Sequence, residues 1–565
     1  MRKFFPGAVG IIPMVYFLFF YRFSFNFEVE ENGHYLLLLF FSLAQVCRIV
    51  FPASRGGLVQ GRILDGLGSL TILALYLLLG PGNEYASVFL SLVIGFIFFF
   101  QADVQTLIYL LYGFIPFLLI EIVLAAIQYC QGLPVRGSLQ NTGIFSIYLS
   151  LHIPLVFYAI YKNKLPRILL LLFLLFSLGV ILEEHSRTAL ISILLIMASL
   201  MYERVNGISR KVWYVAAPGG VILLSGLAWY LYSLKKLSAQ GRLLMSNIAF
   251  KHITDQFWWG TGIGRFTWYY PQWQSAYFRD TSASPPHFYL SAGESYVIFN
   301  EYLQAFETVG VFGFIGCLLV LIAFFKTQSR EYKDLLRAIK LTMVAILACG
   351  FTSYPFHVNI IFFLFVVCLS IGFKISGKVM SPRFFRFSWA GSIAFIFSGI
   401  LFALALNQCA AVWRWQQIRS NTELPYGEKK IGYSKLYPTL KNDGKFLTDY
   451  GAFLADSVAD IAQSVRLLEE ARQHFFSKQT IEALGYAYWK ANDLPNAVAC
   501  FEWENNYLPN LFGPKLMLMK LYKETGDTGR MRAIGRVIIS TPPKIPSEEV
   551  NAIKYQAKEF LLRNY

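Results

Sequence analysis

Charged residues are scarce in this chain of 565 residues, where Asp, Glu, Lys and Arg make up 15% and hydrophobic residues make up 56%. Soluble globular domains carry about 25% charged residues, so the composition excludes an ordinary soluble protein. Cysteine is also scarce, with seven scattered residues and no C-x-x-C pair, which argues against a disulfide framework or a zinc site. The seven histidines show no metal-ligand spacing. We therefore expect no metal cofactor.

Long apolar runs are abundant instead. About 20 consecutive apolar residues cross a bilayer as a helix, and about thirteen stretches qualify. They lie near residues 4–21, 34–51, 63–80, 85–101, 105–128, 143–161, 167–183, 187–202, 211–233, 298–325, 334–351, 355–374 and 388–407. The runs are too long for barrel strands and do not alternate. No small-residue cleavage site follows the first run, so we interpret it as a retained span rather than a cleaved signal peptide. Together the runs predict an all-α, polytopic membrane protein with about 12–13 spans.

The net charge of +16 follows the pattern of a membrane topology. Lys and Arg concentrate in alternate connections, such as 162–167, 326–340 and 374–386, whereas connections such as 28–31 and 81–84 are acidic or neutral. By the positive-inside rule the N-terminus lies inside, and an odd number of spans places the C-terminal region outside. The charge therefore indicates topology, and we expect no nucleic-acid partner.

The longest polar interruption of the membrane part covers residues 233–297, which the same topology places outside. This loop is rich in Trp, Tyr, Arg and Gly, and loops on a rigid scaffold commonly carry function. Its aromatic residues could stack on sugar rings or form an interfacial belt. No strand precedes its glycine run, Gly260-Thr261-Gly262-Ile263-Gly264, so we interpret the run as a tight turn with close backbone approach.

The apolar runs end near Asn407, so we expect a membrane domain over 1–407 and a soluble helical domain over 408–565. The tail matches the tetratricopeptide pattern at Leu484-Gly485, Tyr488, Ala497, Phe501 and Pro509, and a 34-residue step carries Tyr488 onto Tyr522. Ordinary helical hairpins with chance spacing are the alternative. Because stacked repeats leave a concave groove, we predict a module that docks a protein.

Arginines on the outward side are unexpected, because the positive-inside rule concentrates cations on the inner side. Each outward arginine therefore calls for a different explanation. Four arginines lie there: Arg136, Arg187, Arg242 and Arg265. Guanidinium groups bind phosphate well, because their planar donors meet its oxygens two at a time. Arg136 and Arg187 could instead snorkel to lipid headgroups. Several arginines on one face favour an anion site.

Acid–base candidates lie on the same face. They are His185, His252, His287, Glu294 and Glu301. We interpret His252 as a solvated surface residue. Glu301 follows Asn300 where a span enters the membrane from the long loop, a position at which carboxylates often have perturbed acidity.

Four stretches of sequence occur in a characteristic order. They are residues 137–143 (Gly-Ser-Leu-Gln-Asn-Thr-Gly), 186–189 (Ser-Arg-Thr-Ala), Gly241-Arg242 with the glycine run ending in Arg265-Phe266, and 299–304 (Phe-Asn-Glu-Tyr-Leu-Gln) with Glu307 and 310–313. Together they resemble the O-antigen ligase/polymerase superfamily of bacterial membrane glycan transferases, in a branch with a tetratricopeptide tail. The resemblance covers most of residues 100–375.

The resemblance implies an enzyme of the bacterial inner membrane with a periplasmic C-terminal domain. Such enzymes move a glycan from an undecaprenyl-diphosphate carrier to an acceptor, without a nucleotide sugar, a metal or another cofactor. Breaking the sugar–phosphate bond leaves negative charge that fixed cations stabilise. By motif, Arg187 and Arg242 are these cations, and Arg265 is a third candidate for the diphosphate.

The residue that activates the acceptor hydroxyl stays open. Many relatives place a His just before the Asn of the last motif, where this chain has Phe299. A base is needed to remove the hydroxyl proton, and Glu301, Glu294 or His287 could supply it. Alternatively, leaving-group stabilisation by the arginines suffices and Asn300 only orients the acceptor.

Several functions fit these features. The acceptor is lipid A-core in a ligase, or Ser/Thr of exported proteins in an O-oligosaccharyltransferase. A polymerase that joins repeat units competes with both, although it needs no docking tail. A transporter or flippase would explain the spans, but it more typically shows internal repeats or ionisable residues at mid-membrane.

Reporter fusions test the topology. A reporter that is active only outside the cytoplasm should be active when fused at Asn421 or after Tyr565, because an odd number of spans precedes both positions. A cytoplasmic signal at both positions would invert the topology and place Arg187 and Arg242 on the inner side.

Overall fold

The structure is a computed structural model that describes residues 104–139, 141–162, 166–205, 226, 236–280, 285–376 and 390–563. Within these ranges the regular elements are helices and there are no strands, which confirms the all-α fold. The predicted spans near 4–21, 34–51, 63–80 and 85–101 lie outside the described residues. The span near 211–233 does as well, apart from Gly226.

Helices occupy the predicted spans that fall within the described residues. They are α5 (Val104–Cys130), α6 (Thr142–Tyr161), α7 (Arg167–Glu183), α8 (Arg187–Val205), α13 (Glu301–Phe325), α14 (Lys333–Cys349), α15 (Asn359–Ile375) and α16 (Ala390–Ser420). In the part of the chain that the structure describes, four segments are long and apolar enough to cross a membrane: Leu107–Cys130, Thr142–Tyr161, Glu301–Phe325 and Phe395–Ser420. The chain is therefore a membrane protein.

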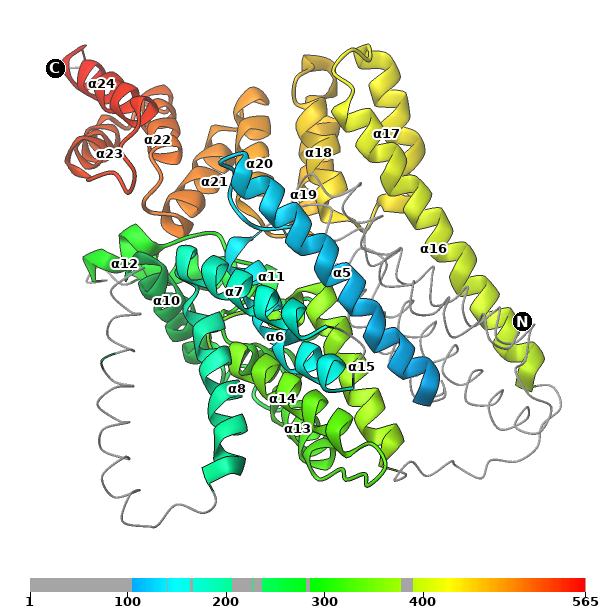
Figure 1. Cartoon of the computed structure of the whole chain (residues 1–565). Coiled ribbons are helices and arrows are strands. Elements are labelled where there is room, and N and C mark those ends of the chain that lie inside the picture. The colour runs from blue at the N-terminus through cyan, green and yellow to red at the C-terminus, as the bar shows by residue number, and fades with distance from the viewer. Residues whose placement is uncertain are drawn as a thin grey trace.

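Helix α6 is the most buried of these four segments. It packs against α7, α8 and α14, while α5 packs against α15 (Figure 1). Its Phe145, Tyr148 and Leu149 are fully buried. By contrast, α7 and α13 expose apolar side chains such as Leu172 and Leu319. Such faces lie against lipid in a membrane, because hydrocarbon solvates them better than water does.

The connections between the membrane helices sort to two ends of the bundle. At one end, the ammonium of Lys162, after α6, lies 3.0 Å from the carboxylate of Asp334 in the first turn of α14. At the other end, the hydroxyls of Thr188, in α8, and Thr352, after α14, are 2.9 Å apart. The described parts of two basic connections, those at Lys162 and at Asp334, thus meet at one end, and the end of Thr352 adjoins the long loop.

The long loop folds into three helices with a small core of their own. They are α10 (Lys236–His252), α11 (Phe266–Asp280) and α12 (Pro286–Ser291). The core includes Leu244, Ile248, Tyr270 and Phe278, all buried. Because this shared core joins α10, α11 and α12, the described part of the loop is a structured cap on the bundle.

The C-terminal tail consists of helical hairpins. Helix α16 continues to Ser420, beyond the expected boundary at 407. It is followed by α17 (Tyr426–Leu440), α18 (Gly444–Leu454), η3 (Val458–Asp460), α19 (Ile461–His474), α20 (Lys478–Lys490), α21 (Leu494–Tyr507), α22 (Gly513–Glu524), α23 (Thr528–Ser540) and α24 (Glu548–Arg563). Asp493 and Asp527, which are 34 residues apart, cap α21 and α23. Its assignment as a tetratricopeptide domain stays a prediction.

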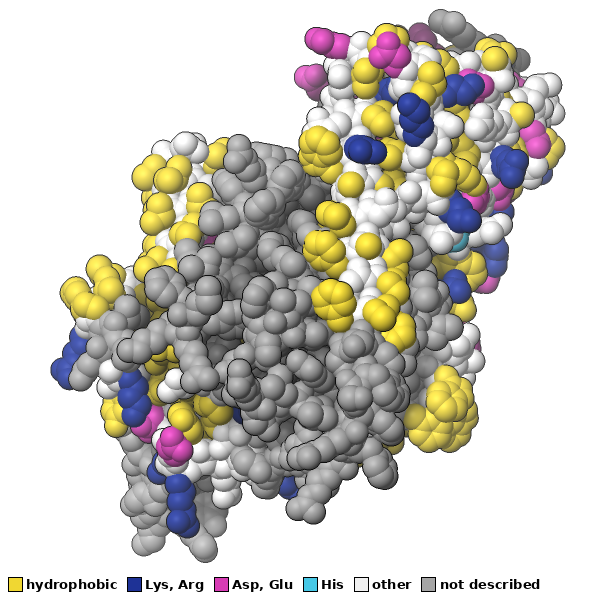
Figure 2. Space-filling view, turned by 90° about the vertical axis from the view of Figure 1, so that its right-hand side faces the viewer, with side chains coloured by type: hydrophobic (Ala, Val, Ile, Leu, Met, Phe, Trp, Pro, Cys, Tyr) yellow, Lys and Arg dark blue, Asp and Glu magenta, His cyan; other side chains and the backbone are white. Residues whose placement is uncertain are grey.

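The surface of the tail differs from that of the membrane helices. In Figure 2, Lys, Arg, Asp and Glu side chains are dispersed over the tail at the upper right, while hydrophobic side chains predominate on the described atoms just below it. Mixed charge suits water, and an apolar surface suits lipid. The charge boundary is therefore consistent with a tail that stands outside the bilayer.

The tail docks on the long loop through specific hydrogen bonds. Helix α11 packs against α21, and the amide of Gln274 donates to the carbonyl of Tyr507 at 2.7 Å. The amide of Asn510 donates to the carbonyl of Ala292 at 2.7 Å. Glu294 accepts a hydrogen bond of 3.0 Å from the backbone N–H of Lys478, in the first turn of α20. The loop and tail thus form a continuous interface.

The buried carboxyl of Glu504 makes this part of the fold sensitive to pH. Glu504 is fully buried in α21, and burial, followed by the charge of Glu482, raises its pKa to about 8, against the opposing effect of Lys478. A raised pKa means that the folded state binds a proton more tightly than the unfolded state. Its contribution to stability is fully present below the ordinary carboxyl pKa and is lost as pH rises through about 8.

We therefore expect the melting temperature of the full-length protein in detergent to fall between pH 5 and pH 8.5, by an amount that Glu504→Gln reduces. Glu502→Gln is the matched control, because Glu502 lies on the same helix but is 42% exposed. It should leave the pH dependence intact. Equal pH dependence in wild type and Glu504→Gln would contradict the assignment.

Candidate active site

The segment of residues 350–357 joins three elements at the end of the bundle next to the long loop. It follows α14 and ends in the short helix η2 (Pro355–His357). Its Gly350 carbonyl accepts from the N–H of Glu301 at 2.7 Å, and its Thr352 contacts both Thr188 of α8 and Arg242 of α10. Side chains from α8, α10 and α13 are therefore positioned around one segment.

Arg242 extends from α10 into this junction. Its guanidinium donates to the carbonyl of Thr352 and lies 4.7 Å from the ring centroid of Phe299, a cation–π contact. Its Nε is buried and has no hydrogen-bond partner among the described residues. Such a donor calls for an acceptor, because an unsatisfied buried donor costs about 1–3 kcal/mol.

Arg187 lies close enough to Arg242 to act on it electrostatically. Burial, and then the charge of Arg187, lower the pKa of Arg242 to about 10, so Arg242 still carries its charge at neutral pH. Arg187 is the first residue of α8, beside Thr188, whose hydroxyl contacts Thr352. Two like charges held together repel each other, and an anion between them removes the repulsion. The pair is thus suited to phosphate oxygens.

Asn300 and Glu301 begin α13 next to these arginines. The side chain of Asn300 accepts from the N–H groups of Tyr302 and Leu303, which makes it the N-cap of the helix. Glu301 is only 4% exposed. Its Oε1 accepts from the N–H of Phe356 at 2.7 Å and lies 3.3 Å from Nδ1 of His357. Both residues therefore have structural contacts beside the arginine pair.

The glycine run and a break in α13 interlock. Gly310 has φ 63° and ψ −173°, which interrupts the helix. The carbonyls that the break leaves without helical partners, those of Glu307 and Thr308, accept from the N–H groups of Thr261 at 2.7 Å and Gly262 at 3.0 Å. A Cβ at Gly260 or Gly310 would collide with the opposite backbone. This is the tight turn with close backbone approach that the glycines indicate.

The remaining site candidates lie elsewhere. Arg265 is exposed and its charge acts on His474 of α19, whereas the charge that acts on Arg242 is that of Arg187. Glu294 is hydrogen-bonded to the tail. His287 is exposed on α12, with its ring against Phe288. The structure thus brings Arg187, Arg242, Asn300 and Glu301 together around the 350–357 segment, and it places the other three candidates at the loop surface or the tail interface.

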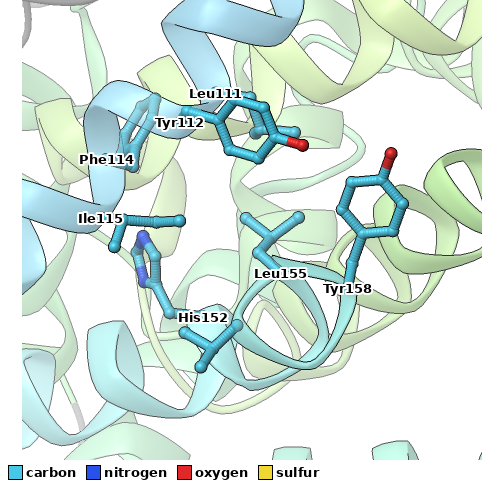
Figure 3. Close-up of a pocket in the computed structure, with 8 residues that line it drawn as sticks. Leu111, Tyr112, Phe114, Ile115, His152, Leu155 and Tyr158 are labelled. Atoms are coloured by element: carbon cyan, nitrogen blue, oxygen red, sulfur yellow. The ribbon is translucent and has the colours of Figure 1, made fainter. Parts of the chain in front are cut away.

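A small cavity between α5 and α6 lies away from this junction. Figure 3 shows its lining, in which His152 and the hydroxyls of Tyr112 and Tyr158 are the polar groups among apolar side chains. Tyr158 is in the last turn of α6, close to the Lys162–Asp334 pair. The cavity therefore belongs to the opposite end of the bundle from the arginine pair.

Another ionisable residue of the membrane helices also has a structural role. Glu121 of α5 is fully buried and accepts from the N–H of Ser138 at 2.8 Å, which anchors the connection before α6. Within the described ranges, no group of three or more His, Cys, Asp or Glu could hold a metal ion. The arginine pair is thus the charged feature best suited to a ligand.

His357 was not among the sequence candidates. The signal was present, because Ser353-Tyr354-Pro355-Phe356-His357 is a polar and aromatic break at the loop-side end of two apolar helices. The contact with Glu301 spans 56 residues, and no local pattern connects the two.

Comparison with known proteins supports the resemblance seen in the motifs. A family model described as O-antigen ligase matches residues 171–318, a range that includes Arg187, Arg242, Asn300 and Glu301 but neither His357 nor the tail. The match confirms the relationship to the O-antigen ligase superfamily and indicates glycan transfer of the ligase or polymerase type at a membrane. No curated protein matches the chain.

Substitution of Gly310 tests the interlock. Gly310→Ala places a side chain in a backbone region that is nearly restricted to glycine, at a cost of about 1–3 kcal/mol, and adds a collision with the backbone of Trp258. We expect a lower melting temperature in detergent. Gly316→Ala, on the same helix with open space at its Cβ, should leave the melting temperature unchanged or raise it. Equal melting temperatures would contradict the interlock.

Proposed function

We propose that the chain transfers a glycan from a polyprenyl-diphosphate carrier to an acceptor at the periplasmic face of the bacterial inner membrane. The acceptor is lipid A-core or Ser/Thr of exported proteins. The observation that carries the proposal is the pair of like-charged guanidinium groups of Arg187 and Arg242, beside the first turn of α13. The family match agrees with this class of reaction.

The chemistry explains why such a pair is useful. Transfer breaks the bond between the anomeric carbon and the phosphate oxygen, and the lipid diphosphate leaves with the bonding electrons. Its charge grows in the transition state, so cations that are already in place stabilise the transition state more than the ground state. Arg242 is fixed by Thr352 and Phe299, so its guanidinium needs little rearrangement when charge develops on the diphosphate.

The acceptor is activated next to the pair. Of the three base candidates, Glu301 is the one beside the arginines, while Glu294 is hydrogen-bonded to the tail and His287 lies on the loop surface. Asn300 sets the start of α13 and so the position of Glu301. Glu301 and Asn300 therefore form the acceptor side of the proposed site.

The docked tail favours transfer to a large acceptor over polymerisation. Gln274 and Asn510 tie the tail to the loop that carries Arg242, so a protein or lipid–glycan held by the tail would lie near the proposed site. A polymerase is the second candidate, since the family match includes that reaction type. A transporter is less favoured, because buried Glu121 in α5 is engaged by Ser138.

Substitution of the arginines tests the proposal. Purified protein in vesicles, supplied with lipid-linked glycan and acceptor, should lose about 100-fold or more of its turnover with Arg187→Ala or Arg242→Ala. Lys at either position should restore part of it, because it retains the charge and loses the bidentate geometry. Both variants should still insert and accumulate.

Arg279→Ala is the matched control, because Arg279 is exposed on α11 of the same loop and is paired with Asp280. Its turnover should match that of wild type. Wild-type turnover by both Arg187→Ala and Arg242→Ala would overturn the assignment of the diphosphate site.

A further inference from the structure

We propose that His357 is the general base of the transfer and that Glu301 is the residue that positions it. The inference rests on the proposed function and names the group that takes the acceptor proton. It follows from a contact between two elements that are distant in sequence: His357 in η2 and Glu301 in the first turn of α13.

The pair has the geometry of an oriented imidazole. Nδ1 of His357 lies 3.3 Å from Oε1 of Glu301, and the side chain of Glu301 is 4% exposed while that of His357 is 20% exposed. The same carboxylate oxygen accepts from the N–H of Phe356 at 2.7 Å, so the backbone of the residue before His357 holds this oxygen in place. The carboxylate is thus enclosed, and the imidazole is the member of the pair that a substrate can reach.

The carboxylate also determines which ring nitrogen can accept a proton. A carboxylate next to Nδ1 favours the tautomer in which Nδ1 carries the hydrogen. Nε2 then has the lone pair that a general base needs. Glu301 further stabilises the imidazolium that forms when Nε2 takes a proton. Glu301 is poorly suited to be the base itself, because its Oε1 already has two nitrogen neighbours.

His357 belongs to the segment that fixes the arginine pair. The carbonyl of Thr352, in the same 350–357 segment, accepts from Arg242. The ring of Phe299 lies 4.7 Å from the Arg242 guanidinium and 5.0 Å from the ring of Tyr354. One short segment therefore connects the proposed diphosphate site to the imidazole.

Phe299 itself cannot supply a base, because its side chain is a hydrocarbon ring packed under Arg242. The imidazole of His357 instead lies against the carboxylate of Glu301. The proposed site thus holds an acid–base group and a cation pair without any residue of the tail.

In the proposed step, the acceptor oxygen replaces the diphosphate on the anomeric carbon of the glycan. Nε2 of His357 takes the proton of the acceptor hydroxyl, and the oxygen forms a bond to the anomeric carbon of the glycan. The bond from that carbon to the phosphate oxygen breaks, and the diphosphate keeps the bonding electron pair. The departing diphosphate lies between Arg187 and Arg242. The proton on His357 then passes to the departing diphosphate or to water, which restores the base.

The test compares His357→Gln and His357→Ala with Glu301→Gln in the vesicle assay. His357→Gln should lower turnover at saturating donor by about 100-fold or more, with much less change in the donor KM. It should also remove the acidic limb of the pH–rate profile, which reports protonation of the base. Added imidazole should restore turnover in His357→Ala. Glu301→Gln should lose about 10–100-fold, as for a residue that orients a functional group.

His252→Gln is the matched control, since His252 lies in the same loop-side region, stacked on Trp273 and paired with Asp255. It should retain both turnover and the acidic limb. The inference is overturned if His357→Gln keeps the turnover and the acidic limb of wild type, or if Glu301→Gln loses more turnover than His357→Ala and imidazole gives no rescue.

These outcomes are separate from failure of the proposed function. If Arg187→Ala and Arg242→Ala are inactive while His357→Gln is normal, the transferase stands and the base assignment falls. If wild-type protein transfers no lipid-linked glycan in vesicles, the proposed function fails first, and the base assignment falls with it.

Discussion

The repulsion between Arg187 and Arg242 is the constraint on which the proposed active site depends. The two guanidinium groups come from different helices, α8 and α10, and burial, followed by the charge of Arg187, lowers the pKa of Arg242. Holding them together requires fixed contacts, which Thr352 and Phe299 provide for Arg242. In the proposed site, a diphosphate bound between the two groups would relieve this repulsion, and the fixed contacts would preorganise the pair for binding.

The long loop and the tail support this arrangement from outside the bundle. Arg242 lies on α10, whose core is shared with α11, and α11 packs against α21 of the tail. The glycine run inserts against the break at Gly310, which connects the same loop to α13. Each support uses backbone hydrogen bonds or buried side chains, so the loop has few ways to move without disturbing the arginine.

Hydropathy was sufficient to predict the helical, membrane-spanning character of the described part of the chain. Long apolar runs predicted the membrane helices that the structure describes, because length and composition alone decide whether a helix can cross a bilayer. The motifs led to the superfamily and to Arg187 and Arg242. The glycine run predicted a close backbone approach, since a missing side chain is a local property.

Contacts over long sequence separations could not be predicted in the same way. Glu294 resembled an acid–base candidate, but it binds the N–H of Lys478, 184 residues away. Glu301 had no visible partner until the fold brought His357 to it. In the sequence, Gly310 looked like an ordinary small residue of a membrane helix, with no sign that the helix breaks there. In each case the partner is set by tertiary packing, which a single sequence does not encode locally.

Direct binding of the leaving group tests the central claim most directly. Undecaprenyl diphosphate without a glycan should bind the wild-type protein in vesicles saturably. The double variant Arg187→Ala/Arg242→Ala should raise the Kd by about 100-fold or more, since it loses two charge-assisted contacts that are each worth about 1.5–3 kcal/mol. The Arg279→Ala control should bind as wild type does. Equal affinity of wild type and the double variant would contradict the assignment of this arginine pair to the diphosphate.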